Sequence, residues 1–257
     1  ATGQAFGAST HFADGQQFQN GETYDFSGSS MGFGAGTNFG DARTFGAGAN
    51  FTGAQTFVGA NTFGDNVKFG DGQTFSAAQT FGAGANFTGN TDFATGQAFG
   101  ASTHFADGQQ FPSGEDYTFT GSSMGFGDGT NFGKARSFGT GANFTGAQTF
   151  VGANTFGDNV KFGAGQTFSA AQTFGTGANF TGNTDFSTGQ SFGASTHFAN
   201  GQQFQVGETY DFTGSSMGFG SGTTFGDPRT FGAGANFTGA QTFVGANTFG
   251  NNVKFGA

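Results

Sequence analysis

The chain has 257 residues with 41 Phe and 53 Gly but no Leu, Ile, Trp or Cys, a composition that excludes an ordinary globular core, disulfides and thiolate metal sites. The net charge is −9 with only seven Lys and Arg, so neither nucleic acid nor an anionic membrane is an expected partner. No apolar run is long enough to span a bilayer.

A ladder of Phe residues runs through the chain from Phe6 to Phe255. The stretch FGAGANFTGAQTFVGANTF, residues 45–63, places a Phe at every sixth position, and the whole ladder has 34 six-residue steps, three of eight and three of seven. A helix would scatter residues six apart around its axis and would contain too many Gly. A short strand followed by a tight turn rich in Gly, Asn and Asp fits six residues, which predicts one side of a β-solenoid coil.

The first irregular segment spans residues 19–33, and it returns at 112–126 and 205–219. Tyr24 lies six residues after Phe18, so the ladder is expected to continue through the Tyr, with three extra residues before Phe33. This predicts a corner bulge on one coil in five. The alternative is a protrusion that binds Ca²⁺ or a partner through Glu22 and Asp25. The bulges also supply candidate lateral contacts between neighbouring fibres: Tyr24, Met31, Tyr117, Met124, Tyr210 and Met217.

The regular segments predict how many sides a coil has. Residues two before each Phe share its face of the strand, and one class of Phe in three is preceded there by a row without amides, as in Met31, Ala49 and Val67. The other two classes carry mostly Gln, Asn or Thr. This period of 18 predicts a three-sided solenoid whose core includes Phe51, Phe69, Phe87, Phe144 and Phe162.

A long repeat of 93 residues divides the chain into 1–93, 94–186 and a partial copy, 187–257. Each full copy contains 15 ladder steps, which is five coils of three. We therefore expect one continuous solenoid over 1–257. Neither terminal sequence looks like a cap, and the chain is expected to be a segment of a longer repetitive polymer.

The ladder resembles the hexapeptide-repeat left-handed β-helix class, which also has 18-residue coils and one large apolar residue per hexapeptide. The resemblance implies an all-β, three-sided and left-handed solenoid, here with Phe as the repeated core residue. Many members of that class are acyltransferases with a His near a subunit boundary. Only the period matches here, so no catalytic residue or cofactor is carried over.

Three further groups of residues recur with the long repeat. His11, His104 and His197 lack the neighbouring ligands of a metal site and are expected to be solvated. Arg43, Arg136 and Arg229 point inward by parity and would need an acidic partner such as Asp25. The tripeptide NFT matches the glycosylation acceptor pattern at five positions, which repetition alone explains.

These observations predict a structural, self-assembling extracellular or cell-surface fibre without catalytic activity, with further copies of itself as partner. The alternatives are a binding module: a phage or cell-surface adhesin shaft, or an ice-binding solenoid that uses the row Thr44, Thr62 and Thr80. That row breaks at Ala98 and Asp25.

Overall fold

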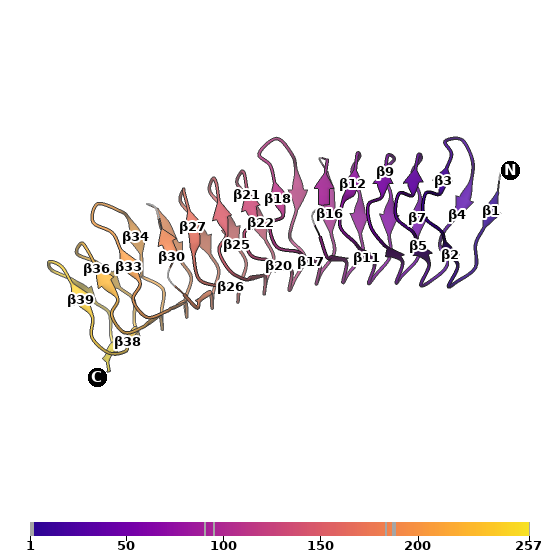
Figure 1. The fold of residues 1–257 in the computed structure, drawn as a ribbon. Helices are drawn as coiled ribbons and strands as arrows, with labels where there is room; N and C mark the ends of the chain where they lie inside the picture. Colours follow the sequence, from indigo (N-terminus) through magenta and orange to yellow (C-terminus); the bar gives the residue numbers. More distant parts are fainter. Residues whose placement is uncertain (1–2, 90, 95, 183, 187–188, 257) are drawn as a thin grey trace. The chain divides into compact units, whose positions relative to one another are not determined.

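The chain folds into a β-solenoid. A computed structural model describes residues 3–89, 91–94, 96–182, 184–186 and 189–256, and contains no helix in these ranges. The chain divides into two compact units, Ala1–Gly127 and Asp128–Ala257, which are described separately. Within each unit, short parallel strands stack coil upon coil (Figure 1).

Three ladders of strands run along the first unit. The first ladder is β2 (His11–Phe12), β5 (Gly32–Phe33), β8 (Asn50–Phe51), β11 (Lys68–Phe69), β14 (Asn86–Phe87), β17 (His104–Phe105) and β20 (Gly125–Phe126). The second is β3 (Gln17–Phe18), β6 (Asn38–Phe39), β9 (Thr56–Phe57), β12 (Gln73–Phe75) and β15 (Thr91–Phe93), followed after a break by β18 (Gln110–Phe111). The third is β1 (Gln4–Ala5), β4 (Tyr24–Asp25), β7 (Thr44–Phe45), β10 (Thr62–Phe63), β13 (Thr80–Phe81), β16 (Gln97–Phe99) and β19 (Tyr117–Thr118), in which a single bridge, Phe26 to Phe45, links β4 to β7.

The second unit repeats this arrangement. Its first ladder is β23 (Asn143–Phe144), β26 (Lys161–Phe162), β29 (Asn179–Phe180), β32 (His197–Phe198), β35 (Gly218–Phe219), β38 (Asn236–Phe237) and β41 (Lys254–Phe255). Its second is β21 (Asn131–Phe132), β24 (Thr149–Phe150), β27 (Gln166–Phe168) and β30 (Thr184–Phe186), then after a break β33 (Gln203–Phe204), β36 (Thr224–Phe225) and β39 (Thr242–Phe243). Its third is β22 (Ser137–Phe138), β25 (Thr155–Phe156), β28 (Thr173–Phe174), β31 (Gln190–Phe192), β34 (Tyr210–Asp211), β37 (Thr230–Phe231) and β40 (Thr248–Phe249).

The register of the ladders confirms the predicted coil of about 18 residues. Lys68 and Phe69 pair with Asn50 and Phe51 of the preceding coil and with Asn86 and Phe87 of the next. Each strand therefore lies beside the third strand along the chain, and like residues align. The fold class, an all-β solenoid built from Phe hexapeptides, is confirmed; left-handedness, the number of flat sides and the single continuous body over 1–257 stay predictions.

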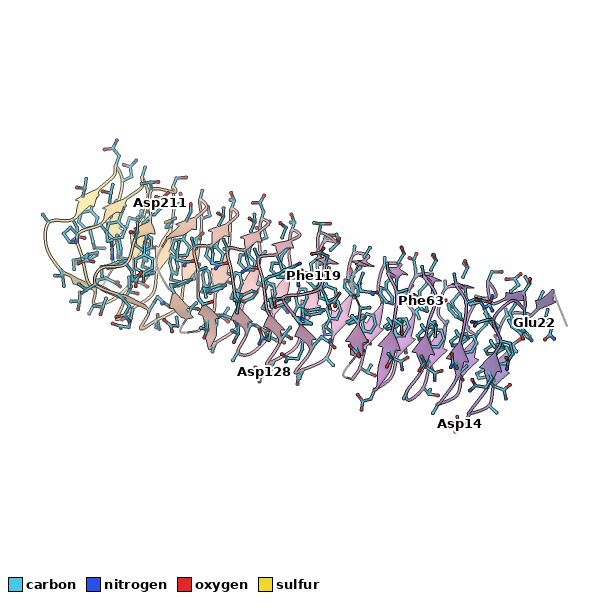
Figure 2. All side chains as sticks on the ribbon, turned by 90° about the horizontal axis from the view of Figure 1, so that it is seen from above. Asp14, Glu22, Phe63, Phe119, Asp128 and Asp211 are labelled. Carbon is cyan, nitrogen blue, oxygen red and sulfur yellow. The ribbon has the colours of Figure 1, made fainter. Side chains whose placement is uncertain are left out.

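Alternation within each hexapeptide orients the side chains. In β10 the Phe63 ring is buried and Thr62 is exposed, because successive strand residues point to opposite faces. Residues two before a Phe point inward as predicted: Met31, Ala49 and Val67 are fully buried, as are most of the Gln and Asn at this position. In Figure 2 Phe63 lies inside the stack, whereas Asp14 lies at its outer edge.

The corner before the first ladder always takes a left-handed backbone conformation. Ser30, Gly48, Asn66, Gly84 and Ser102 occupy it in successive coils, with φ between 56° and 72°. Gly adopts this conformation without steric cost, and Asn tolerates it better than most residues. The corners are also hydrogen-bonded from coil to coil: the Gly48 N–H donates to the Asp65 carbonyl at 2.8 Å, and the Asn66 N–H donates to the Ala83 carbonyl at 2.8 Å.

Candidate functional site

The predicted core residues lie in columns of stacked rings. The Phe69 ring centroid is 5.2 Å from that of Phe51 and 4.7 Å from that of Phe87, with interplanar angles of 5° and 8°. In the second unit Phe144 and Phe162 stack at 5.2 Å. All five rings are at most 1% exposed, so they contribute to the structure and cannot contact a ligand.

The irregular segments do not continue the Phe ladder through Tyr, which corrects the expected register. Phe26 stacks on Phe6 at 5.5 Å and on Phe45 at 5.4 Å, so Phe26 occupies the ladder position. Tyr24 instead pairs with Gln4 and takes the inward position two residues earlier. Two extra residues therefore lie between Phe18 and Tyr24, and one lies between Phe26 and Phe33. The ladder step from Phe18 to Phe26 is eight residues, and the step from Phe26 to Phe33 is seven.

The bulge Tyr residues fasten one coil to the next. Tyr117 and Tyr210 are 8% and 7% exposed, and their hydroxyls donate to the carbonyls of Phe93 at 2.9 Å and Phe186 at 3.0 Å. Burial raises the pKa of Tyr210 above its ordinary value. A hydrogen bond from the Gln205 backbone opposes this rise, and the charge of Glu208 adds to it.

The Met residues of the bulges lie inside the solenoid. Met31, Met124 and Met217 are fully buried, in the inward row that also holds Ala49 and Val67. Together with the burial of Tyr117 and Tyr210, this corrects the expectation that bulge Tyr and Met side chains form lateral contacts. Tyr24 is partly exposed, and the guanidinium of Arg43 lies over the face of its ring.

The inward-pointing Arg residues pack on these Tyr rings. The Arg43 guanidinium lies 5.2 Å from the centroid of Tyr24, and its side chain is 8% exposed. Arg229 lies in the same way 5.0 Å from the centroid of Tyr210. Such stacking, together with the neighbouring carboxylate, compensates a desolvated guanidinium. Arg136 is also buried, at 6% exposure.

The acidic partner of these Arg residues is not Asp25. The Arg43 Nη2 lies 3.5 Å from the Asp41 carboxylate, and the Arg229 Nη2 lies 3.6 Å from that of Asp227. Asp25 is exposed and accepts a hydrogen bond from the Ser27 N–H at 2.9 Å. Hydrogen bonds from the Ser27 side chain and backbone lower the pKa of Asp25. The suggested pairing of Arg with Asp25 was therefore wrong.

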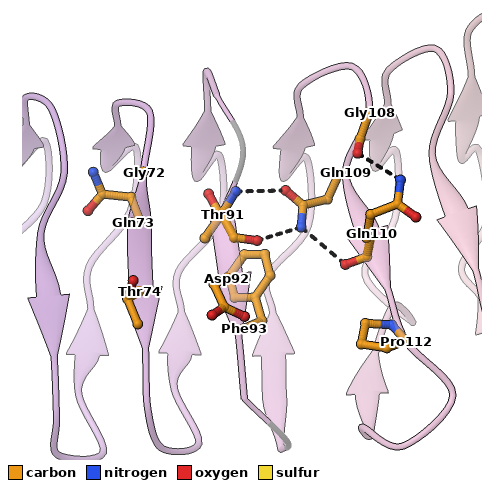
Figure 3. A pocket seen from close by; sticks show the side chains of 10 residues that line it. All are labelled: Gly72, Gln73, Thr74, Thr91, Asp92, Phe93, Gly108, Gln109, Gln110 and Pro112. Atoms are coloured by element: carbon orange, nitrogen blue, oxygen red, sulfur yellow. Dashed lines mark hydrogen bonds between the residues drawn. The ribbon is translucent and has the colours of Figure 1, made fainter.

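Side chains replace the backbone pairing at a break in the second ladder. Between β15 and β18 the Gln109 amide accepts from the Thr91 N–H at 3.1 Å and donates to the Thr91 carbonyl at 2.7 Å (Figure 3). The Tyr117 hydroxyl donates to the Phe93 carbonyl. Elsewhere in the ladder the equivalent Phe carbonyl accepts from the backbone N–H of the residue 19 positions later. The residue at that position is Pro112 in the first unit, which has no N–H, and Gln205 in the second, so the break does not depend on the Pro.

The second unit has the same break between β30 and β33. The Gln202 amide accepts from the Thr184 N–H at 3.1 Å and donates to the Thr184 carbonyl at 2.6 Å. The stacked rings separate here, to 6.2 Å between Phe93 and Phe111 and 6.0 Å between Phe186 and Phe204. We call each break a splice.

A surface groove lies over each splice. The groove of the first unit has a volume of about 360 Å³, and that of the second about 450 Å³. Their shared lining consists of two Gly, three Gln, two Thr and an Asp: Gly72, Gln73, Thr74, Thr91, Asp92, Gly108, Gln109 and Gln110, and correspondingly Gly165, Gln166, Thr167, Thr184, Asp185, Gly201, Gln202 and Gln203. The Phe spacing and the composition do not indicate this groove. The repeated GQQF before each irregular segment is its only signal.

The structure keeps the other candidates apart from one another. His11, His104 and His197 are exposed on the first ladder, where the Nδ1 of His11 lies 2.9 Å from the Ser9 carbonyl oxygen. Among the described residues, no group of three or more His, Cys, Asp or Glu could hold a metal ion. Thr44, Thr62 and Thr80 pair in register on the exposed face of the third ladder, and Ala98 follows them.

No described helix is both long and apolar enough to cross a membrane. Comparison of this chain with protein-family models, curated proteins and solved structures finds no match.

Proposed function

We propose that this chain is a structural, self-assembling fibre protein, extracellular or at the cell surface, that has no catalytic role and grows by stacking coil on coil. The observation that carries the proposal is the repetition of one coil contact. Moving along a ladder by one coil restores the same ring stacking, the same backbone hydrogen bonds and the same corner bonds, as between Phe51, Phe69 and Phe87. An array of this kind has no length at which stacking stops being favourable.

The rings show what a neighbouring coil contributes. Phe162, with a coil on both sides, is fully buried, whereas the equivalent Phe255 is 59% exposed and Phe249 is 38% exposed. A further coil laid on β39, β40 and β41 would cover these rings and pair with their open strand edges. Burial of apolar area is worth about 25 cal/mol per Å², so each coil that is added to a stack gains free energy by covering the rings of the coil before it.

Electron microscopy and sedimentation velocity of the chain at micromolar concentration test this proposal. We expect filaments and a sedimentation coefficient that rises with concentration. The variant Phe249→Asp/Phe255→Asp, which places charge on the exposed ring face, should remain monomeric. Val151→Asp/Val206→Asp is the matched control, because these two Val residues are 41% and 72% exposed away from that face, and it should still assemble. A wild-type chain that sediments only as a monomer would refute the fibre.

Ice binding is the second candidate, because exposed Thr residues align in register on the third ladder of both units. Thr44, Thr62 and Thr80 do so in the first unit, and Thr155 and Thr173 in the second. Thermal hysteresis measured with the wild type and with Thr62→Lys tests it. Activity that Thr62→Lys abolishes would favour ice binding, and absence of hysteresis in the wild type would reject it.

A further inference from the structure

Each splice groove presents a row of polar side chains on the outward face of the second ladder. Thr74, Asp92 and Gln110 follow one another there from coil to coil in the first unit, and Thr167, Asp185 and Gln203 do so in the second. Asp92, Gln110, Asp185 and Gln203 are exposed. The row therefore offers a hydroxyl, a carboxylate and an amide within one concave surface.

The two coils beneath each groove are joined differently from those of the regular ladder. Where the strands of this ladder pair directly, the stacked rings of the column lie 4.8 to 5.5 Å apart, as between Phe57 and Phe75 and between Phe75 and Phe93. At the splice a glutamine amide and a tyrosine hydroxyl stand between the two coils, and the rings are 6.0 to 6.2 Å apart. Each groove is thus lined in part by a buried side chain with fixed hydrogen bonds, since Gln109 and Gln202 are 2% and 1% exposed.

We propose that the two splice grooves are binding sites for a neutral oligosaccharide, one site in each unit. A carboxylate only accepts hydrogen bonds, a threonine hydroxyl both donates and accepts, and a glutamine amide does both through different atoms. Neighbouring sugar hydroxyls match this set, because each of them also donates and accepts. The volumes of about 360 and 450 Å³ lie within the range of small-molecule sites.

Other ligand classes fit the lining less well. An anion would face Asp92 or Asp185, and no Lys, Arg or His lines either groove. A divalent cation prefers several oxygen ligands with more than one carboxylate, whereas each groove has a single Asp. An apolar ligand would leave the Asp and the exposed Gln without partners. This inference is independent of fibre assembly, since each groove lies within one unit.

Isothermal titration calorimetry of the full chain with maltotriose, cellotriose and N,N′,N″-triacetylchitotriose, each up to 10 mM, tests the proposal. We expect at least one of these neutral sugars to bind saturably with two sites per chain. Asp92→Asn or Asp185→Asn should halve the stoichiometry, and the double variant should weaken binding at least tenfold. The reason is that the Asn amide has one acceptor oxygen where the Asp carboxylate has two. The Asp side chains are exposed, so these variants should fold, which circular dichroism verifies.

The matched control is Asp65→Asn/Asp158→Asn, which changes the net charge equally at a corner outside the grooves. Both carboxylates accept a backbone N–H, from Ala83 and Thr176, and Asn can accept the same bonds. This variant should bind like the wild type. The proposal is overturned if none of the three sugars binds, if the Asp92→Asn/Asp185→Asn variant binds like the wild type, or if the control loses binding equally.

Discussion

Phe69 shows how a single ring is held in the solenoid. Besides its two stacked neighbours, it makes edge contacts with Phe63 at 5.0 Å and Phe75 at 5.6 Å. Stacked and edge-to-face pairs each contribute about 0.5–1.5 kcal/mol beyond the area that they bury. The ring is thus fixed by neighbours in its own coil and in both adjacent coils.

Phe69→Ala should lower the free energy of unfolding by about 3–5 kcal/mol, because neighbouring rings fixed by their own stacking cannot collapse into the cavity. Urea denaturation measures the loss, and hydrogen exchange locates it. Increased exchange should be confined to the coils around β11, since every ladder contact is between adjacent coils. Uniformly increased exchange over both units would contradict this prediction.

Tyr210 should titrate above the ordinary tyrosine value of about 10, because burial favours its neutral form. The folded state then keeps a proton that the unfolded state loses. Its stabilising contribution is complete below the unfolded pKa and is lost as the pH rises through the folded pKa. Absorbance at 295 nm, compared between the wild type and Tyr210→Phe, isolates this group. A Tyr210 transition at or below the ordinary value would be inconsistent with its buried hydrogen bond to Phe186.

At the scale of the element, the regular hexapeptide could be predicted because three signals agree. The six-residue step, the alternation of Phe with Thr or Asn, and the period of 18 in the inward row all describe the same coil. Thr56, Phe57, Thr74 and Phe75 then pair as that period requires. Nothing competes with this arrangement in the regular coils.

The irregular segments could not be placed from spacing alone, because Tyr24 and Phe26 are both aromatic. The six-residue step favours Tyr24 as the ladder residue. Burial favours Phe26, because that position is fully enclosed and would leave a phenol hydroxyl without a partner. The inward position two residues earlier gives the Tyr a hydrogen-bond acceptor in the preceding coil, as Tyr117 and Tyr210 show.

The splice itself could not be predicted, because it depends on the side chains of two different coils. Gln109 resembles every other inward Gln in the sequence, such as Gln55 and Gln73. Most of those Gln residues donate to corner carbonyls, whereas Gln109 bonds to both backbone groups of Thr91. This difference arises only where the following coil has the longer step.

Gln109→Ala should destabilise the coils at the splice, because it leaves the buried Thr91 N–H and carbonyl without their partner. An unsatisfied buried polar group costs about 1–3 kcal/mol. Gln110→Ala is the control, since this exposed side chain donates to the Gly108 carbonyl of its own coil. Hydrogen exchange at Thr91 should accelerate in Gln109→Ala and not in Gln110→Ala. Equal protection of Thr91 in both variants would show that the amide does not hold the ladder.

On the scale of the whole molecule, each unit contains strand ladders, ring columns and one splice. Among the described residues, each strand finds its partners about 18 residues away, as in β11 and β26. Solenoid stability is the sum of the coils and the contacts between adjacent coils. This local organisation is why a periodic sequence specified so much of the fold.

The fragments 1–127 and 128–257 should therefore each fold alone. Far-ultraviolet circular dichroism should show β structure for both, and each should have a separate thermal transition. A scrambled 1–127 sequence, with the same composition but no Phe period, is the control and should remain unfolded. If either native fragment is as disordered as the scrambled chain, the units depend on contacts beyond adjacent coils.

The repeated register also has a consequence for the gene that encodes this chain. The 93-residue copies return every strand to its own ladder, so unequal recombination between copies would lengthen or shorten the protein by five coils without a new contact. Loss of a single hexapeptide would instead shift every later strand to a neighbouring ladder and displace the splice glutamines from their threonines. Natural variants should therefore differ in length by whole coils of about 18 residues or by multiples of 93 residues, and not by single hexapeptides.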